Sequence, residues 1–258
     1  MKRTLLCGLL AAAALCLPVQ AARPAAVQVD GERLETSAYV KEGTAYAPLR
    51  ELLEALGDWN VWWDGSAARA VSENASLLAD PNGNVLTVNG QRYPCFVDVI
   101  EGRTYVPLRL TAEALGGSAR WDPWLDGAAV TSPHAEHDAM DYYWLARIIH
   151  AESGGEALEG QIAVGNVVLN RVASGDFPDS IPGVIFDDEN GVQFEPVSNG
   201  TVANAPTELS LEAARRVLSG ENTVGNALYF FAPALSQGTW IDSSRTYQQT
   251  IGCHRFYN

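Results

Sequence analysis

The residue best placed for acid–base chemistry is Glu152, which follows the apolar stretch Tyr142 to Ala151 and precedes Ser153-Gly154-Gly155. A helix should end at this glycine break, leaving the carboxyl at the end of an apolar helix. Partial burial there disfavours the charged form and raises the pKa, as a general acid working near neutral pH requires. The glycines would also let a bulky substrate approach the backbone closely. By position alone, an ordinary solvated glutamate is the competing interpretation.

Two predicted helices flank this residue. The first runs from Tyr142 to Ala151 and carries Leu145, Ile148 and Ile149 on one side. The second covers Leu158 to Val172, where apolar residues recur at the helical period. Its apolar residues are Ile162, Val164, Val167, Val168 and Leu169. We expect both helices to be largely buried.

The last 118 residues contain a series of short motifs in a fixed order, beginning at the first helix. They are Leu145 to Glu152, Gly155-Glu156, Glu159 to Val164, Val168 to Val172, Phe177-Pro178, Ile181 to Phe186, Gln193 to Val197, Ala227 to Phe230 and Ile251 to Phe256. The series resembles the SleB/CwlJ family of cell wall hydrolases. The resemblance implies a small lysozyme-like α+β domain acting on peptidoglycan, with Glu152 at the family's catalytic glutamate. Glu156 and Glu159 are expected at a helix start and in structural contacts.

The resemblance also implies lytic transglycosylase chemistry, which does not need the carboxylate pair of most glycosidases. Glu152 would protonate the oxygen between N-acetylmuramic acid and N-acetylglucosamine, then deprotonate the muramoyl C6 hydroxyl. That hydroxyl would attack the anomeric carbon and leave a 1,6-anhydro end. The interpretation calls for no cofactor and no metal ion.

Polar and aromatic side chains in the same region are candidates for contacts with the glycan strand. They are Gln161, Asn170, Gln193, Phe194, Tyr229, Phe230 and His254. For each of them a structural role is the competing interpretation, because an aromatic residue in a predicted strand commonly lies in the core.

Other activities stay open at this point. A muramidase needs a second carboxylate or a positioned water, and Asp187, Asp188 and Glu195 are available. An N-acetylmuramoyl-L-alanine amidase needs three zinc ligands. It is disfavoured because, of the histidines at 134, 137, 150 and 254, the first two lie in a predicted linker. A non-catalytic protein that binds cell wall or spore coat is the third alternative.

Residues 27–131 contain an internal duplication. The first copy has Val29-Asp30-Gly31, Glu42 to Arg50, Glu54 to Gly57 and Trp63-Asp64, and the second repeats these as Val88-Asn89-Gly90, Glu101 to Arg109, Glu113 to Gly116 and Trp121-Asp122. Each copy predicts strand, turn, strand, helix and strand, with Asp-Gly and Asn-Gly as hairpin turns. The expected fold class is therefore α+β, with a duplicated ββαβ domain before the lysozyme-like domain of residues 141–258.

The duplicated region resembles the copper amine oxidase N-terminal-like domain. Copper does not follow from this resemblance, because the sequence has no histidine before His134 and copper prefers imidazole or sulfur ligands. A wall-binding module and a rigid spacer are both compatible with the pattern. Tryptophans that could stack on sugars are Trp59, Trp62, Trp63 and Trp121, although we expect most of them in the core.

The remaining features concern export and assembly. Residues 1–21 resemble a secretory signal peptide, with Lys2 and Arg3 before an apolar run, so we expect a protein secreted to the cell wall or spore envelope; retention as an uncleaved anchor is the alternative. The net charge of −14 argues against nucleic acid as a partner, and we expect no integral membrane association. Residues 132–140 are a predicted linker. The sequence leaves open whether Cys95 and Cys253 form a disulfide.

Overall fold

The computed structural model describes residues 22–189, 191–235 and 239–258, so the predicted signal peptide lies outside the described residues. The strands and helices up to residue 131 are β1 (Arg23–Pro24), β2 (Ala26–Val29), β3 (Glu32–Leu34), β4 (Tyr39–Lys41), β5 (Thr44–Pro48), α1 (Leu49–Leu56), β6 (Asn60–Trp63), β7 (Ala68–Val71), β8 (Ser76–Asp80), β9 (Val85–Val88), β10 (Gln91–Pro94), β11 (Asp98–Ile100), β12 (Arg103–Pro107), α2 (Leu108–Ala114), β13 (Ser118–Asp122) and β14 (Gly127–Thr131).

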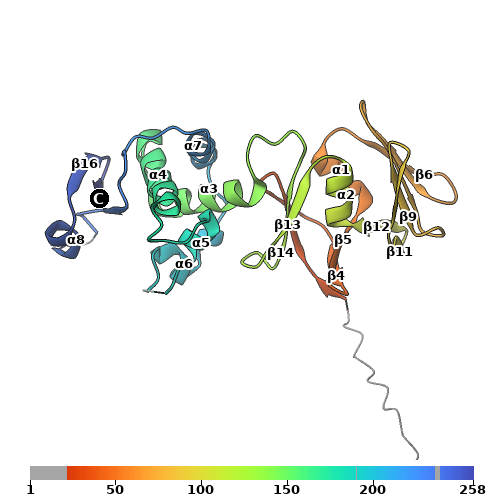
Figure 1. Ribbon diagram of the computed structural model, residues 1–258, viewed down its shortest axis with the longest axis horizontal. Helices are drawn as coiled ribbons and strands as arrows, with labels where there is room; N and C mark the ends of the chain where they lie inside the picture. Colours follow the sequence, from red (N-terminus) through yellow and green to blue (C-terminus); the bar gives the residue numbers. More distant parts are fainter. Residues whose placement is uncertain (1–21, 190, 236–238) are drawn as a thin grey trace, which may run out of the picture.

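The part that follows is mainly helical and ends in a small sheet. Its elements are α3 (Ala139–Ser153), α4 (Leu158–Ser174), α5 (Ile181–Ile185), α6 (Glu195–Asn199), a 3₁₀ turn (Thr201–Ala203), α7 (Glu208–Leu218), β15 (Tyr229–Phe231), α8 (Thr239–Ser244), β16 (Tyr247–Ile251) and β17 (His254–Tyr257). Figure 1 shows an elongated molecule in which α3 leads from the strand-rich part into the helical part. The expected α+β class, with a β-rich N-terminal part, is confirmed.

The duplication appears in the structure as an approximate two-fold relationship. Equivalent strands β5 and β12 pair antiparallel at the centre of a five-stranded sheet of order β1-β4-β5-β12-β11. Ala47 of one repeat lies opposite Val106, its counterpart in the other. The first hairpin of each repeat joins a sheet that also holds the last hairpin of the other repeat, and the two repeats therefore share one apolar core.

Each repeat holds more strands than the sequence predicted. Four equivalent strands, β2–β5 in the first repeat and β9–β12 in the second, precede the helix and two follow it, instead of the expected ββαβ order. The predicted Asp30-Gly31 and Asn89-Gly90 turns are present with positive φ at both residues, as a type I′ hairpin requires. The missed hairpins turn at Glu42-Gly43 and Glu101-Gly102, where the glutamates also have positive φ, near 50°. A glutamate seldom adopts this conformation, so the pattern gave no turn signal there.

The predicted linker is fastened at both ends. The backbone N–H of Ser132 donates to Asp30 Oδ1 at 2.7 Å. The side chain of Asp138 caps α3 by accepting from the backbone of Met140 and Asp141, and it also pairs with Arg120. Helix α3 begins at residue 139, within the range expected to be linker.

Aromatic and polar contacts join the two parts of the molecule beyond this segment. In α3, the indole Nε1 of Trp144 donates to Oδ2 of Asp122 in β13 at 2.8 Å, and both side chains are buried. Trp124 stacks on Phe186 with ring centroids 4.9 Å apart. These contacts tie the strand-rich part directly to the helix that carries Glu152.

The expectation that most of the four tryptophans in the repeats lie in the core is wrong. Trp59 packs against the core, but Trp62, Trp63 and Trp121 are 39%, 50% and 36% exposed. They lie on β6 and β13, two short strands with mostly exposed residues, and the consecutive Trp62 and Trp63 are both exposed. These indoles are therefore available to a ligand.

Candidate active site

Glu152 lies in the last turn of α3, where the preceding apolar side chains Leu145, Ile148 and Ile149 are fully buried. Burial is the largest influence on its carboxyl and raises the pKa of Glu152 to about 7, with a further increase from Glu195 and an opposing effect from Arg171. The carboxyl therefore exists in both protonation states near neutral pH. That property suits a group that first gives and then takes a proton.

The glycine break has two separate roles. The Cβ atom of a larger residue at position 154 would lie 2.5 Å from the carbonyl oxygen of His150. Because that distance is a steric clash, glycine is needed at the point where the chain leaves α3. Gly155 is exposed and has no atom within 4 Å of the place a side chain would occupy. The backbone beside Glu152 is thus open on one side, as expected from the sequence.

Arg171 is a cation that faces this region, and it was not among the predicted site residues. It projects from the buried face of α4, and its Nε donates to the carbonyl oxygen of Leu228 at 2.8 Å. Burial lowers the pKa of Arg171 to about 10. Its Nη1 is buried and has no hydrogen-bond partner among the described residues. The feature of the sequence that could have identified Arg171 is its helical spacing from the apolar residues Val164, Val167 and Val168.

Aromatic rings surround the Arg171 guanidinium. Its carbon lies 4.9 Å from the ring centroid of Phe177, 5.1 Å from that of Phe194 and 5.7 Å from that of Tyr229. Tyr229 in turn packs edge-on against Trp240, whose side chain is 58% exposed. No periodic pattern surrounds Trp240 in the sequence, so it was not among the predicted contact residues.

The predicted contact residues fall into two groups. Phe194 and Tyr229 lie near Arg171, whereas Phe230 faces the opposite side of β15 and packs against His254, with ring centroids 5.4 Å apart. This separation follows from the alternation of side chains along a strand. Gln193 is half-buried, and its Nε2 donates to the carbonyl oxygen of Gly191.

The two predicted amide side chains of α4 are engaged within the protein. Gln161 is fully buried; its Nε2 donates to the carbonyl oxygen of Glu156 at 3.0 Å and its Oε1 accepts from Ser210. Asn170 donates to the carbonyl oxygens of Gly225 and Ala227, both at 2.9 Å. These bonds hold the loops around the end of α3 and before β15. Direct contact between either residue and substrate stays a prediction.

Glu156, Cys253 and His254 form the one group of three potential metal ligands found among the described residues. Glu156 Oε1 accepts from the backbone N–H of Cys253 at 3.2 Å and from its thiol, and lies 3.8 Å from His254 Nδ1. The hydrogen bond to Glu156 raises the pKa of Cys253, which favours the thiol over the thiolate that binds metals. The cluster therefore fastens the β16–β17 turn to the loop after α3. Cys253 and Cys95 are both free thiols.

None of the helices among the described residues has the length and apolar character needed to cross a membrane.

Comparison with known proteins places these features in a family. Residues 155–257 match the family model described as Cell Wall Hydrolase, and residues 28–127 match the Copper amine oxidase N-terminal domain. A cell wall hydrolase CwlJ from Oceanobacillus iheyensis is 32% identical over 104 residues, which cover 38% of this chain and 72% of that protein. A spore cortex-lytic enzyme from Bacillus cereus is 34% identical over 143 residues, which cover 55% of this chain and 52% of that protein.

A solved structure, the catalytic domain of the germination-specific lytic transglycosylase SleB from Bacillus anthracis, is 35% identical. The match covers 48% of this chain and 98% of the chain in that structure, with a TM-score of 0.44. The chain spans about half the length of the spore cortex-lytic enzymes it matches.

The site thus combines the half-buried Glu152 carboxyl, whose pKa is near neutral, with a buried arginine and aromatic rings. The chain belongs to the cell wall hydrolase family.

Proposed function

We propose that this chain is an exported lytic transglycosylase that cleaves the bond between N-acetylmuramic acid and N-acetylglucosamine in peptidoglycan. The observation that carries the proposal is the burial-raised pKa of Glu152, about 7, at the end of α3. A carboxyl at that pKa is protonated often enough to act as an acid and ionised readily enough to act next as a base. The relatives named as spore cortex-lytic enzymes support cortex peptidoglycan as the substrate and the spore envelope as the location.

In the proposed mechanism Glu152 makes both proton transfers. It protonates the bridging oxygen as the glycosidic bond breaks, and the resulting carboxylate takes the proton of the muramoyl C6 hydroxyl. The C6 oxygen bonds to the anomeric carbon and closes the 1,6-anhydro ring. Arg171, which favours the ionised form of Glu152, stabilises the carboxylate between the two transfers.

The half-buried ring of Tyr229 and the exposed ring of Trp240 are proposed to hold the sugars. Trp240 and Tyr229 present aromatic surface on the same side of the helical part, and Arg245 lies 4.2 Å from the Tyr229 ring centroid. Large rigid rings provide contact area at low cost in conformational entropy.

The proposal is tested by the products of digestion. Purified residues 22–258 are incubated with spore cortex and with vegetative peptidoglycan, and the released fragments are identified by mass spectrometry. Anhydro-muramoyl ends are the expected product. Free stem peptides would indicate an amidase, and no release from either substrate by the folded protein would indicate a binding protein.

Substitution of the catalytic acid provides the second part of the test. Glu152→Gln should lower the rate by a factor on the order of 10²–10⁴, the usual contribution of a positioned acid or base. Glu159→Gln is the matched control, because Glu159 is an exposed acid in the first turn of α4 and should leave the rate unchanged. Normal cleavage by the Glu152→Gln variant would refute the assignment.

A muramidase is the second candidate, since Glu195 raises the pKa of Glu152 and so lies near it. A nearby second carboxylate is what a hydrolytic mechanism needs. Reducing muramic acid ends in the same digestion would identify this activity.

A further inference from the structure

A large cavity lies in the N-terminal part, away from Glu152. It has a volume of about 550 Å³ and is lined by the start of α2, by β13 and by the turn between β4 and β5. A second cavity of about 310 Å³ is lined by the start of α1, by β6 and by the turn between β11 and β12. We call them the larger and the smaller cleft.

The two clefts are equivalent under the internal duplication. The larger one contains Pro107-Leu108-Arg109, Trp121 and Gly43, and the smaller one contains their counterparts Pro48-Leu49-Arg50, Trp63 and Gly102. Each cleft therefore combines the helix and tryptophan of one repeat with the hairpin turn of the other. It exists only because β5 and β12 pair at the centre of the sheet.

The arginine at the helix start is held in the same way in both clefts. Arg109 Nε donates to the carbonyl oxygen of Ala119 at 3.1 Å, and Arg50 Nη2 donates to that of Val61, the equivalent residue, at 2.7 Å. One bond to the backbone fixes the guanidinium and leaves other N–H groups for a ligand.

The smaller cleft contains an ion pair that the larger cleft lacks. Arg103 Nη1 and Glu51 Oε1 lie 3.3 Å apart in the smaller cleft. The equivalent positions in the larger cleft are Thr44 and Leu110, which cannot form an ion pair. The larger cleft therefore stays open.

The lining of the larger cleft favours an anionic ligand, although the whole chain carries a net charge of −14. Three arginines and a single carboxylate, Glu113, line it. Two of the arginines have carboxylate partners: Arg23 pairs with Asp126, and Arg120 with Asp138. Arg109 has no carboxylate within 4.0 Å among the described residues, so it is the cation available to a ligand.

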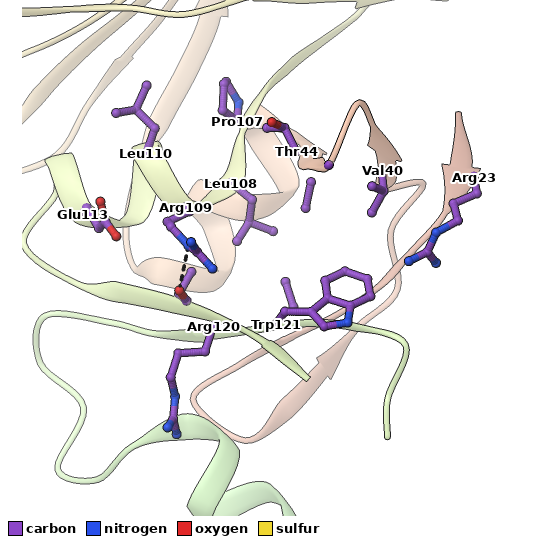
Figure 2. A pocket seen from close by; sticks show the side chains of 14 residues that line it. Arg23, Val40, Thr44, Pro107, Leu108, Arg109, Leu110, Glu113, Arg120 and Trp121 are labelled. Atoms are coloured by element: carbon purple, nitrogen blue, oxygen red, sulfur yellow. Dashed lines mark hydrogen bonds between the residues drawn. The ribbon is translucent and has the colours of Figure 1, made fainter. Parts of the chain in front are cut away.

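An apolar surface lies beside this cation. Figure 2 shows the side chains of Arg109 and Trp121 at the cleft, reaching it from α2 and β13. The Trp121 indole is 36% exposed, and the Arg23 guanidinium lies 5.1 Å from its ring centroid. Arg23 is already paired with Asp126, so Arg109 is the guanidinium in this cleft that has no carboxylate partner within the described part of the chain. A flat apolar ring and a free guanidinium that line one cleft match a ligand that carries both a sugar face and a carboxylate.

We propose that the larger cleft binds peptidoglycan through a muramoyl unit and its stem peptide, with Arg109 on a carboxylate of the peptide and Trp121 against the sugar. This inference rests on the proposed function, which puts the chain in contact with that polymer. The cleft would hold the enzyme on its substrate, while the smaller cleft, closed by Glu51 and Arg103, does not bind.

Binding is measured with residues 22–258 carrying Glu152→Gln, so that the polymer is not digested. The probe is purified insoluble peptidoglycan in a co-sedimentation titration. Trp121→Ala and Arg109→Gln should each weaken binding about tenfold or more, as expected for central anchors. Trp63→Ala and Arg50→Gln, the equivalent changes in the smaller cleft, are the matched controls and should change it less than about twofold.

The outcomes separate the possibilities. Binding that survives Trp121→Ala, or that falls equally with Trp63→Ala, overturns the proposal. Chitin, which shares the N-acetylglucosamine backbone but lacks carboxylates, should bind at least about tenfold more weakly than peptidoglycan; equal binding overturns the role of Arg109. Circular dichroism confirms that each variant is folded.

A different outcome would refute the proposed function alone: the unsubstituted chain binds peptidoglycan through Trp121 but releases no fragments from it.

Discussion

The Arg171 guanidinium and the Glu152 carboxyl influence each other from neighbouring helices. Glu152 favours the charged form of Arg171, and Arg171 favours the charged form of Glu152, but burial outweighs the attraction at both groups. The carboxyl at the end of α3 therefore keeps a pKa of about 7, while the arginine stays protonated. This relationship determines how the proposed activity depends on pH.

The rate of peptidoglycan cleavage should fall as the pH rises through about 7. Glu152 must carry a proton to act as the acid, and its pKa is about 7 instead of the usual 4.5. Above that pH the rate should drop about tenfold for each pH unit. A pH–rate profile measured with soluble glycan fragments tests this. An alkaline limb near the ordinary pKa of glutamate would contradict the assignment.

Glu195→Gln should shift that alkaline limb to lower pH and keep the anhydro product. The Glu195 carboxylate raises the pKa of Glu152 by charge repulsion, so its removal lowers that pKa. Glu195 is exposed, so the fold should not depend on it. Product analysis and a pH–rate profile of the variant provide the measurement. A loss of activity by about 10² or more would support the muramidase mechanism instead.

Glu152→Gln should stabilise the folded protein at alkaline pH. A carboxyl whose folded pKa is raised contributes stability below its unfolded pKa, and this contribution is lost as the pH rises through the folded pKa of about 7. Near pH 8 the ionised glutamate should cost up to ~3 kcal/mol in the free energy of unfolding. Urea titrations should show a more stable variant near pH 8 and no difference near pH 4. Equal stability at both values would mean that Glu152 is solvated.

Trp144→Phe should destabilise the connection between the two parts of the molecule. The substitution removes the N–H that donates to Asp122 and leaves a buried carboxylate oxygen without that partner. The expected cost is ~1–3 kcal/mol in the free energy of unfolding, measured by thermal or urea denaturation. Trp240→Phe is the control, because Trp240 is exposed and packs against Tyr229 of the C-terminal part. An equal effect of both changes would argue against a special role for the Trp144–Asp122 contact.

Local sequence patterns determined the helices, the duplication and the position of Glu152. Apolar residues at helical spacing predicted α3 and α4, because a helix must bury one face, and the glycines after Glu152 marked where α3 ends. The motif series also identified the cell wall hydrolase family, which the comparisons confirmed. These features depend on residues that are close together in the chain.

Only the tertiary structure decided which distant residues meet. Arg171 lies near Glu152 because α3 and α4 pack together, and Trp240 reaches Tyr229 only after the C-terminal segment folds back. The two clefts require pairing between strands of different repeats, and the ion pair between Glu51 and Arg103 lies in only one of them. A sequence pattern records which face of an element is apolar, but the packing of those faces determines which polar groups lie together and how far water is excluded from them.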